Sequence, residues 1–284
     1  MQALTMPSTT VLRRESPAPL VAWPIQGTTR GAGFVAALTG VACAVVPLAA
    51  FAASAPTDSR WVDLESRIEY GYYTEDGRAL EGLTGQLAAD SSPDGIRSYY
   101  AGLADYRLSQ LESAKDKSRA RDRAGRCVAS LDHAAQANPL GAALAETLAL
   151  KSACLALLSD IDGWRAPLAA PKSRSLIEKA LHLAPRNPRV LLLDAVGAFE
   201  RAPNGEDKER AVGKLKKAIA ALEDEREDIV HVPGWGLAEA YAYLGRIYLD
   251  RGDTVAARDA LERALLAAPE FGQARRLMTK ITSG

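Results

Sequence analysis

The sequence of 284 residues has little of the chemistry that metal sites and most enzymes require, with only three histidines and three cysteines. It contains no HExxH, CxxC, GxSxG or glycine-rich phosphate-binding motif. His133, His182 and His231 have no second histidine, cysteine or carboxylate cluster at metal-ligand spacing. The run Asp160–Gly163 (DIDG) has the start of a calcium-binding loop, but the rest of that loop is missing. We therefore predict that the protein is not an enzyme and holds neither a metal nor a cofactor.

The sequence also lacks an excess of either charge, and it has few aromatic residues. It contains 35 basic and 35 acidic residues, and aromatic residues make up 6% of the chain. Because nucleic-acid binding requires a concentrated basic surface, we expect no nucleic-acid partner. Alanine and leucine are abundant, which favours helices over sheets.

Residues 31–57 carry no charged side chain. Arg30 precedes this apolar run, and Ala50–Ala52 (AFA) has the small-x-small pattern of a signal-peptidase site. We therefore predict that residues 1–52 are an export signal with a long basic leader, and that the protein is periplasmic. The alternatives are an uncleaved membrane anchor that leaves the chain facing the periplasm, a lipid on Cys43, or a buried helix. Only an uncleaved segment would contact the membrane.

The most regular pattern lies between residues 238 and 271. Its first half has aromatic, apolar and small residues at the spacing of one helical face, and its second half repeats such a face before a proline. Gly252 can end the first helix, and Asp253 or Thr254 can cap the second. The sequence thus predicts an antiparallel helix pair. Its defining residues are Tyr241, Leu244, Gly245, Tyr248, Ala257, Leu261, Ala264 and Pro269.

This order of residues resembles the tetratricopeptide repeat (TPR), in which antiparallel helix pairs stack into a solenoid. One pair cannot bury its own faces, so other pairs should precede it. Three upstream segments each place an alanine five residues before a proline, and successive prolines are 46 residues apart, which predicts longer helices or loops than in a standard repeat. These residues are Ala88, Ala134 and Ala180 with Pro93, Pro139 and Pro185.

The resemblance implies an all-α, right-handed α-solenoid of about five helix pairs with a C-terminal closing helix. We expect an N-terminal helix pair in residues 53–92 and a TPR-like helical repeat domain in residues 93–284. Over roughly residues 90–275 the sequence also resembles exported bacterial TPR proteins, a resemblance that brings no activity with it.

In TPR proteins the first helices of successive pairs line a concave groove that holds peptides or partner proteins. The resemblance therefore implies a non-catalytic, extracytoplasmic scaffold for protein–protein interaction or envelope complex assembly, with an unidentified protein or peptide partner. The groove would draw on aromatic residues and on charges of both signs. The candidates are Tyr99, Arg107, Glu146, Arg189, Phe199, Glu239, Arg246 and Asp250.

Two long connections between the predicted helices depart from the repeat pattern and carry Trp164, Arg165 and Trp235. Such connections often carry function. The alternative function is therefore a small-molecule or transport-accessory binding protein, with a pocket under these tryptophans. The tryptophans could equally pack over helix ends and close the core.

Cys127 and Cys154 flank the turn predicted at Pro139, twelve residues before it and fifteen after it. At about 1.5 Å of rise per residue, their sulfurs would lie at similar heights on adjacent antiparallel helices. They could form a disulfide in an exported protein, or remain two small buried thiols.

Overall fold

The computed structural model describes residues 59–89, 95–163, 167–202, 204–227 and 233–282. The regular structure of these residues is entirely α-helical. The predicted export signal, residues 1–52 with Cys43, lies outside them. The helices are α1 (Ser59–Tyr73), α2 (Gly77–Ala89), α3 (Gly95–Glu112), α4 (Lys117–Ala137), α5 (Gly141–Asp162), α6 (Ala169–Leu183), α7 (Pro188–Glu200), α8 (Gly205–Glu227), α9 (Leu237–Asp250), α10 (Thr254–Ala267) and α11 (Gly272–Thr282).

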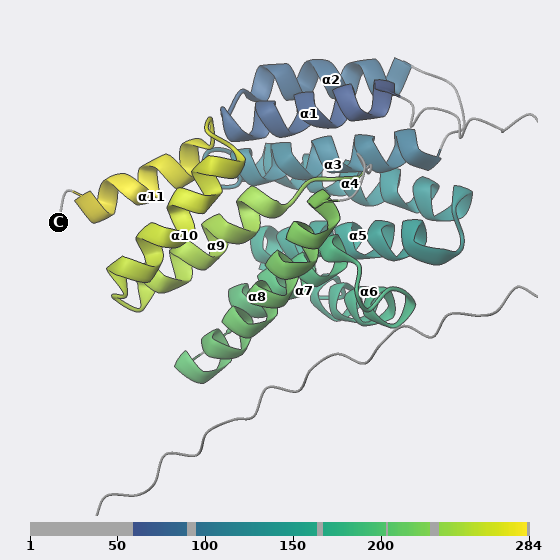
Figure 1. Cartoon of the computed structure of the whole chain (residues 1–284). Coiled ribbons are helices and arrows are strands. Elements are labelled where there is room, and N and C mark those ends of the chain that lie inside the picture. The colour runs from purple at the N-terminus through teal and green to yellow at the C-terminus, as the bar shows by residue number, and fades with distance from the viewer. Residues whose placement is uncertain (1–58, 90–94, 164–166, 203, 228–232, 283–284) are drawn as a thin grey trace, which may run out of the picture. The chain divides into compact units, whose positions relative to one another are not determined.

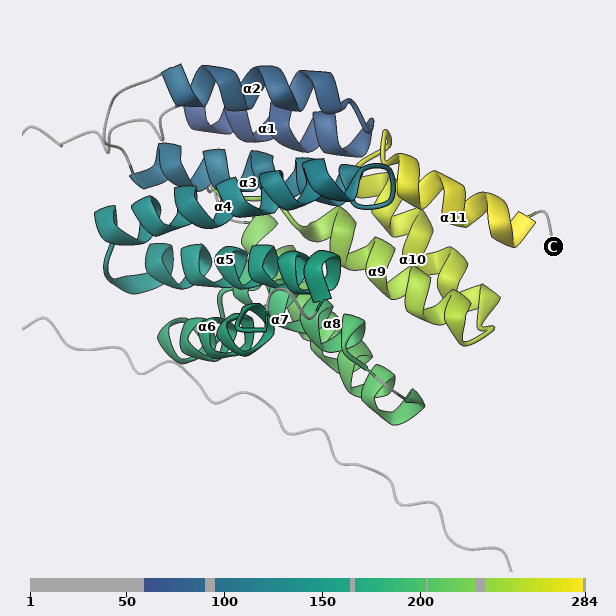
Figure 2. The same cartoon turned by 180° about the vertical axis from the view of Figure 1, so that it is seen from behind.

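Consecutive helices form five antiparallel pairs, from α1–α2 to α9–α10, and α11 packs on the last pair (Figure 1). The pairs stack side by side, as the view from behind also shows (Figure 2). The all-α, repeated-pair architecture with a closing helix is therefore confirmed. Helices α3, α4 and α5 have 18, 21 and 22 residues, whereas α9 and α10 have 14 each. The wider upstream spacing thus reflects longer helices.

Short polar residues and one glycine set the helix boundaries of these pairs. Asp253 caps α10 by accepting a hydrogen bond from the backbone N–H of Ala256 at 3.1 Å, so it is the cap rather than Thr254. Gly252 has a φ of +77°, which favours glycine after a helix end. Asn187 caps α7 in the same way as Asp253 caps α10.

The first helix of each pair is more deeply buried than the second. Helices α3, α5, α7 and α9 have buried residues around most of their circumference. Helices α4 and α10 bury a single stripe of small and apolar residues. The first helices therefore form the inner layer of the stack, and the second helices form its outer layer.

Within three of the pairs, a glycine on the first helix faces a leucine on the second. A Cβ atom placed on any of these glycines would approach the leucine to between 2.7 and 3.1 Å, closer than carbon atoms pack. The pairs of residues are Gly71 with Leu80, Gly102 with Leu131, and Gly245 with Leu261. Helices α5 and α6 instead cross at Ser152 and Ser173, whose hydroxyls each donate to the other residue's carbonyl oxygen at 2.8 Å.

The residues that define the last pair lie as the repeat pattern predicts. Tyr241, Leu244, Gly245, Ala257, Leu261 and Ala264 are buried, Tyr248 is half-buried, and Pro269 follows the end of α10 on the surface. Because Gly245 and Ala257 are small, the two helices approach closely where they cross.

Among the described helices, α5 is long and apolar enough to cross a membrane by length and composition. However, 61% of its apolar window is buried inside the structure, where α5 packs against α4, α6 and α7. This is the environment of a core helix.

We expect Gly245→Ala to lower the free energy of unfolding by about 1–3 kcal/mol, because the added methyl group forces the fully buried Leu261 to move. The matched control is Gly213→Ala on the exposed face of α8, where nothing lies within 4 Å of the added Cβ atom. That change should raise the free energy of unfolding by about 0.5–1 kcal/mol. Urea unfolding measures both. Equal changes in the free energy of unfolding for the two variants would contradict the close approach of α9 and α10 at Gly245.

Candidate binding site on the inner helices

The connection before α9 inserts into the inner layer. Trp235 is only 4% exposed, and its indole N–H donates a hydrogen bond to the hydroxyl of Tyr99 on α3 at 2.9 Å. Gly236 follows with a φ of +122°, and a Cβ atom there would lie 2.8 Å from Leu192 on α7. Residues 233–236 thus occupy the space between the first helices, where a TPR groove would hold its ligand.

Arg107 on α3 is the most deeply buried charged residue of the inner layer, with 2% of its surface exposed. Its guanidinium donates to the Glu69 carboxylate on α1 at 2.8 Å and also to the Glu239 carboxylate on α9. It lies 4.2 Å from the ring centroid of Tyr72 and 5.1 Å from that of Trp235. Ion pairs and cation–π contacts together replace the water that this charge loses on burial.

The N-terminal pair therefore contacts the C-terminal helices directly. The Tyr73 hydroxyl on α1 donates to Glu239 at 2.8 Å, and the Tyr73 ring lies 4.7 Å from the ring of Phe271 before α11. Glu75 forms an ion pair with Arg276 on α11. The described helices thus wrap around a common interior, and the first pair meets the last.

A second carboxylate of α1, Glu65, ties the same region together. It accepts hydrogen bonds from the Tyr100 hydroxyl at 2.7 Å and from the backbone N–H of Gly234 at 2.8 Å. Burial raises the pKa of the Glu65 carboxyl, and these two hydrogen bonds partly offset that effect. Glu65 therefore anchors the inserted connection to both α1 and α3.

A second buried ion-pair network joins α5, α7 and α8. Arg189 donates to Glu146 through Nε at 3.0 Å and to Glu225 through Nη2 at 2.6 Å. Asn187, the cap of α7, also donates to Glu146. Burial raises the pKa of the Glu146 carboxyl, with Arg189 acting in the opposite direction. Charges from neighbouring pairs therefore satisfy one another in the interior.

Because of these networks, most of the eight predicted groove residues lie in the interior and do not line an open groove. Six of them are buried, where an open groove would expose them: Tyr99, Arg107, Glu146, Arg189, Phe199 and Glu239. Arg246 and Asp250 lie nearer the surface; Arg246 pairs with Glu200 at 2.7 Å, and Asp250 lies 4.0 Å from Lys208. The correction has a simple cause: helix wrapping and the inserted connection bring partners from distant pairs onto this face.

Of the predicted loop residues, Trp164 and Arg165 lie outside the described residues. Trp235 packs in the interior, as the core-closing alternative expected. His133 and His182 are exposed, and His231 lies outside the described residues. The described part of the chain contains no group of three or more His, Cys, Asp or Glu residues that could hold a metal ion.

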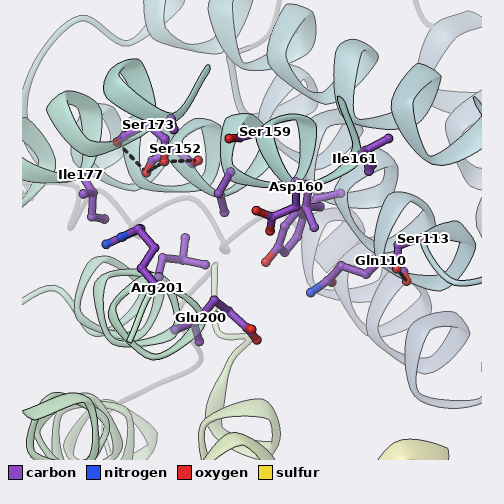
Figure 3. Close-up of a pocket in the computed structure, with 18 of the residues that line it drawn as sticks. Gln110, Ser113, Ser152, Ser159, Asp160, Ile161, Ser173, Ile177, Glu200 and Arg201 are labelled. Carbon is purple, nitrogen blue, oxygen red and sulfur yellow. Dashed lines mark hydrogen bonds between the residues drawn. The ribbon is translucent and has the colours of Figure 1, made fainter. Parts of the chain in front are cut away.

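The opposite end of the inner helices is open. A cavity of about 380 Å³ lies between α3, α5, α6, α7 and α9 (Figure 3). Its apolar wall comes from α5, α6 and α7 and includes Ala156, Leu157, Ile177 and Val196. Helices α5 and α7 hold the Arg189 network near their N-terminal ends and line the cavity with their C-terminal halves, whereas on α3 the buried Arg107 lies directly beside Tyr106 of the cavity lining. The cavity is therefore the unfilled part of the inner face.

Two tyrosines, Tyr106 on α3 and Tyr243 on α9, also line the cavity. Neither hydroxyl makes a hydrogen bond with any of the described residues. Burial, followed by the charge of Glu200, raises the pKa of Tyr243 to about 12. Both hydroxyls therefore remain protonated at neutral pH, and each can donate and accept a hydrogen bond.

Two acidic side chains, Asp160 and Glu200, border the cavity from the last turns of α5 and α7 (Figure 3). Burial raises the pKa of the Asp160 carboxyl, the charge of Glu200 raises it further, and Arg201 lowers it. Arg201 folds back over Gly197 on its own helix. The cavity thus combines apolar walls with acidic groups and hydroxyls.

The sequence alone did not predict this half of the site. Tyr106 is seven residues after Tyr99, so both lie on the same helical face, and that spacing was the available signal. Asp160 was noted only as part of an incomplete calcium loop. Nothing local in the sequence distinguishes the filled half of the inner face from the open half.

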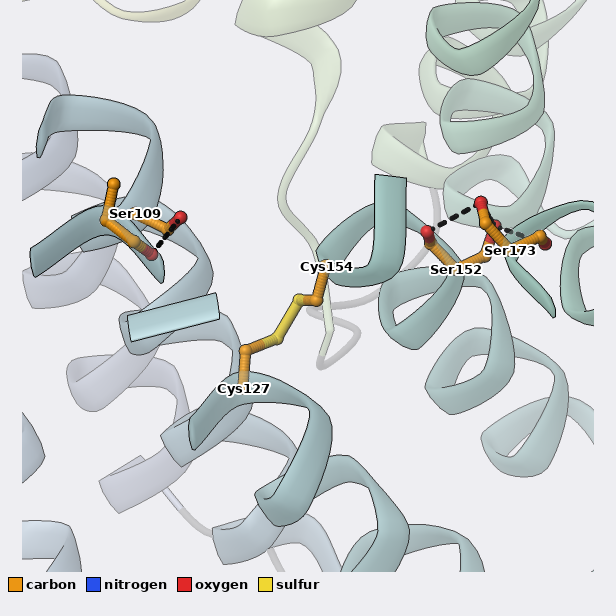
Figure 4. The surroundings of a disulfide bond; sticks show 6 residues. Ser109, Cys127, Ser152, Cys154 and Ser173 are labelled. Carbon is orange, nitrogen blue, oxygen red and sulfur yellow. Dashed lines mark hydrogen bonds between the residues drawn. A yellow bond between two sulfur atoms is a disulfide. The ribbon is translucent and has the colours of Figure 1, made fainter. Parts of the chain in front are cut away.

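Cys127 on α4 and Cys154 on α5 are joined by a disulfide, with their Cα atoms 6.3 Å apart (Figure 4). Both side chains are fully buried. The bond links the outer helix of one pair to the inner helix of the next. Figure 4 also shows the Ser152–Ser173 bridge, which connects α5 onward to α6.

No protein-family model matches the chain, and a comparison with curated proteins finds no match. Among solved structures, the chain is similar to the crystal structure of the APC/C hetero-tetramer Cut9–Hcn1, with 14% sequence identity and a TM-score of 0.36. The match covers 80% of this chain and 43% of that chain, so this chain spans less than half of its length. A TM-score below 0.5 is too low to support an inference about this chain. The description of its architecture is therefore based on its own helix pairs.

We expect the stability of the protein to depend on pH through Glu69. Burial raises the pKa of this carboxyl well above 4.5, although Arg107 lowers it. Above pH 4.5 the unfolded chain releases this proton while the folded protein still holds it, so the free energy of unfolding falls as pH rises toward the folded pKa. Glu69→Gln should make this fall smaller.

Urea unfolding between pH 5 and pH 8 measures the effect. The control is Glu262→Gln on the exposed face of α10, which should keep the wild-type slope. Identical slopes for the wild type and Glu69→Gln would contradict a raised pKa of the Glu69 carboxyl in the folded protein.

The double variant Cys127→Ser, Cys154→Ser should lower the free energy of unfolding by about 2–4 kcal/mol, because the disulfide closes a long loop in the unfolded chain. Reductant should lower the stability of the wild type by a similar amount and leave the double variant unchanged. Alkylation of unfolded, unreduced protein followed by peptide mass mapping tests the bond itself. Alkylated Cys127 and Cys154 would exclude the disulfide.

Proposed function

We propose that this protein is a non-catalytic, extracytoplasmic scaffold that binds a segment of a partner protein in the cavity between α3, α5, α6, α7 and α9. The observation that carries the proposal is the division of the inner face. One half is occupied by the chain's own Trp235 and by paired charges, and the other half offers a cavity with hydroxyls that have no partner among the described residues. A partner segment would complete the unfilled half.

The apolar uncharged run at residues 31–57 supports export, and so does the disulfide between Cys127 and Cys154, because such bonds persist in oxidising compartments. These features together support the proposed periplasmic location and a role in assembling an envelope complex. If the N-terminal segment stays uncleaved, the helical domain faces the periplasm from a membrane anchor.

A small-molecule or transport-accessory binding protein is the second candidate. The volume of the cavity, about 380 Å³, falls within the range of small-ligand pockets. Such a ligand would occupy this cavity rather than the surroundings of Trp235, which are packed. Native mass spectrometry of protein purified from its own host would detect it as a bound mass that disappears on unfolding.

Site-specific photo-crosslinking in intact cells tests the scaffold. A benzoylphenylalanine at Lys117, on the rim of the cavity, should yield a discrete crosslinked protein. The matched control is the same group at Lys217, an exposed position on α8 that does not line the cavity, and it should yield none. Adding Ala156→Phe, which fills the cavity, should remove the crosslinked species from the Lys117 protein.

Ala156→Phe must keep the unfolding free energy of the parent protein within about 1–3 kcal/mol for the comparison to hold, which is the usual cost of overpacking. The scaffold proposal fails if no protein is crosslinked from Lys117. It also fails if Lys217 captures the same species, or if filling the cavity leaves the crosslink unchanged.

A further inference from the structure

The charges at the cavity are not balanced in the same way as those in the filled half. Glu200 is paired with Arg246 at 2.7 Å, whereas Asp160 makes no ion pair within the described part of the chain. The guanidinium of Arg201 folds back over Gly197 and forms no ion pair there either. Asp160 is therefore an exposed carboxylate that borders the cavity without an ion-pair partner there, and the side chains of Lys117 and Arg201 line the same cavity.

The electric field at Asp160 is itself unfavourable for a negative charge. Although the residue as a whole is exposed, burial of part of its carboxyl is the main cause that raises the pKa of Asp160; the charge of Glu200 raises it further, and Arg201 lowers it. Two like charges that border one cavity repel each other, and a cation placed between them would be attracted by both. The field therefore favours a positively charged ligand at this point.

Tyr106 offers a hydrogen-bonding group to a ligand in the cavity. It is only 5% exposed, it lines the cavity, and its hydroxyl has no hydrogen-bond partner among the described residues. In the described part of the chain, every side-chain nitrogen or oxygen that is shielded from solvent has a hydrogen-bond partner, so the Tyr106 oxygen is open to the cavity, where it can accept a hydrogen bond from a ligand N–H group. Ala156, Leu157 and Val196 supply an apolar wall against which an aliphatic stem can pack.

We propose that the cavity binds an alkylammonium or guanidinium group on an aliphatic stem, supplied by a lysine or arginine side chain of the partner polypeptide. The charged group lies between Asp160 and Glu200 and donates to Tyr106, and the stem packs on α5 and α7. This inference rests on the proposed scaffold function and specifies what the partner must present.

Titration by ¹H–¹⁵N NMR tests the proposal with capped alanine-based heptapeptides that differ only in the central residue. The lysine peptide should bind about tenfold or more tightly than the norleucine peptide, since a hydrogen bond to a charged group contributes that much. The glutamate peptide should not bind. Asp160→Asn should weaken the lysine peptide about tenfold, and Tyr106→Phe about threefold or more.

Glu178→Gln, which removes one acidic group from the exposed surface of α6 away from the cavity lining, is the matched control and should leave the affinity unchanged. The free diamine 1,5-diaminopentane is the final probe. If it binds as tightly as the lysine peptide, a free amine rather than a polypeptide is the ligand, and the polypeptide source is overturned.

Cation recognition is overturned if the lysine peptide causes no shifts, if norleucine or glutamate binds as well as lysine, or if Asp160→Asn has no effect. These outcomes are distinguishable from failure of the scaffold. Suppose that a partner is crosslinked from Lys117 but still binds when its lysine and arginine residues are replaced. The scaffold proposal would then stand, and only the proposed recognition of a cation would be overturned.

Discussion

The structure depends on the burial of one positive charge. Arg107 lies in the middle of the inner layer, and an isolated guanidinium there would cost several kcal/mol of solvation. Its two carboxylate partners come from helices far apart in the sequence, Glu69 on α1 and Glu239 on α9. A stack of helix pairs needs contacts only between neighbouring pairs. Arg107, however, meets both of its carboxylate partners only when the first helix pair contacts the last. The array therefore wraps around a shared interior, and both of its ends lie in one network.

That wrapping divides the inner face into two halves with different physical character. Where α1, α3 and α9 meet, polar groups pair with one another and Trp235 fills the remaining space. The C-terminal halves of α5 and α7 and the N-terminal part of α6 surround a cavity instead. Among the described residues, no connection comparable to that of Trp235 is inserted there. The Tyr106 and Tyr243 hydroxyls have no hydrogen-bond partner among the described residues, and together with the exposed Asp160 and Glu200 they are the polar groups that the cavity offers to a ligand.

Local pattern was sufficient for the helices and their pairing. The spacing of Tyr241, Gly245 and Leu261 predicted the last pair and its close crossing, because both depend on residues within one repeat. It also placed Arg107 and Glu239 on the inner face correctly. It could not predict their burial, since their partners come from another part of the chain and only the wrapping of the whole array brings them together. The cavity was not predicted for the same reason: its lining residues come from six helices, and no single segment carries its pattern.

The same long-range contacts determine how well the cavity can select a ligand. Its walls include the C-terminal halves of α5 and α7, whose N-terminal ends are fixed by Arg189, and the part of α3 that lies beside Arg107. The disulfide attaches α5 to α4, and the Ser152–Ser173 bridge attaches it to α6. A ligand therefore meets walls that are already ordered, so little binding free energy is used to order them. If a ligand places its charge at the wrong point in such a site, the helices do not move to reduce the resulting repulsion. The buried charges of Arg107 and Arg189 thus hold the cavity walls in place, although neither residue lines the cavity.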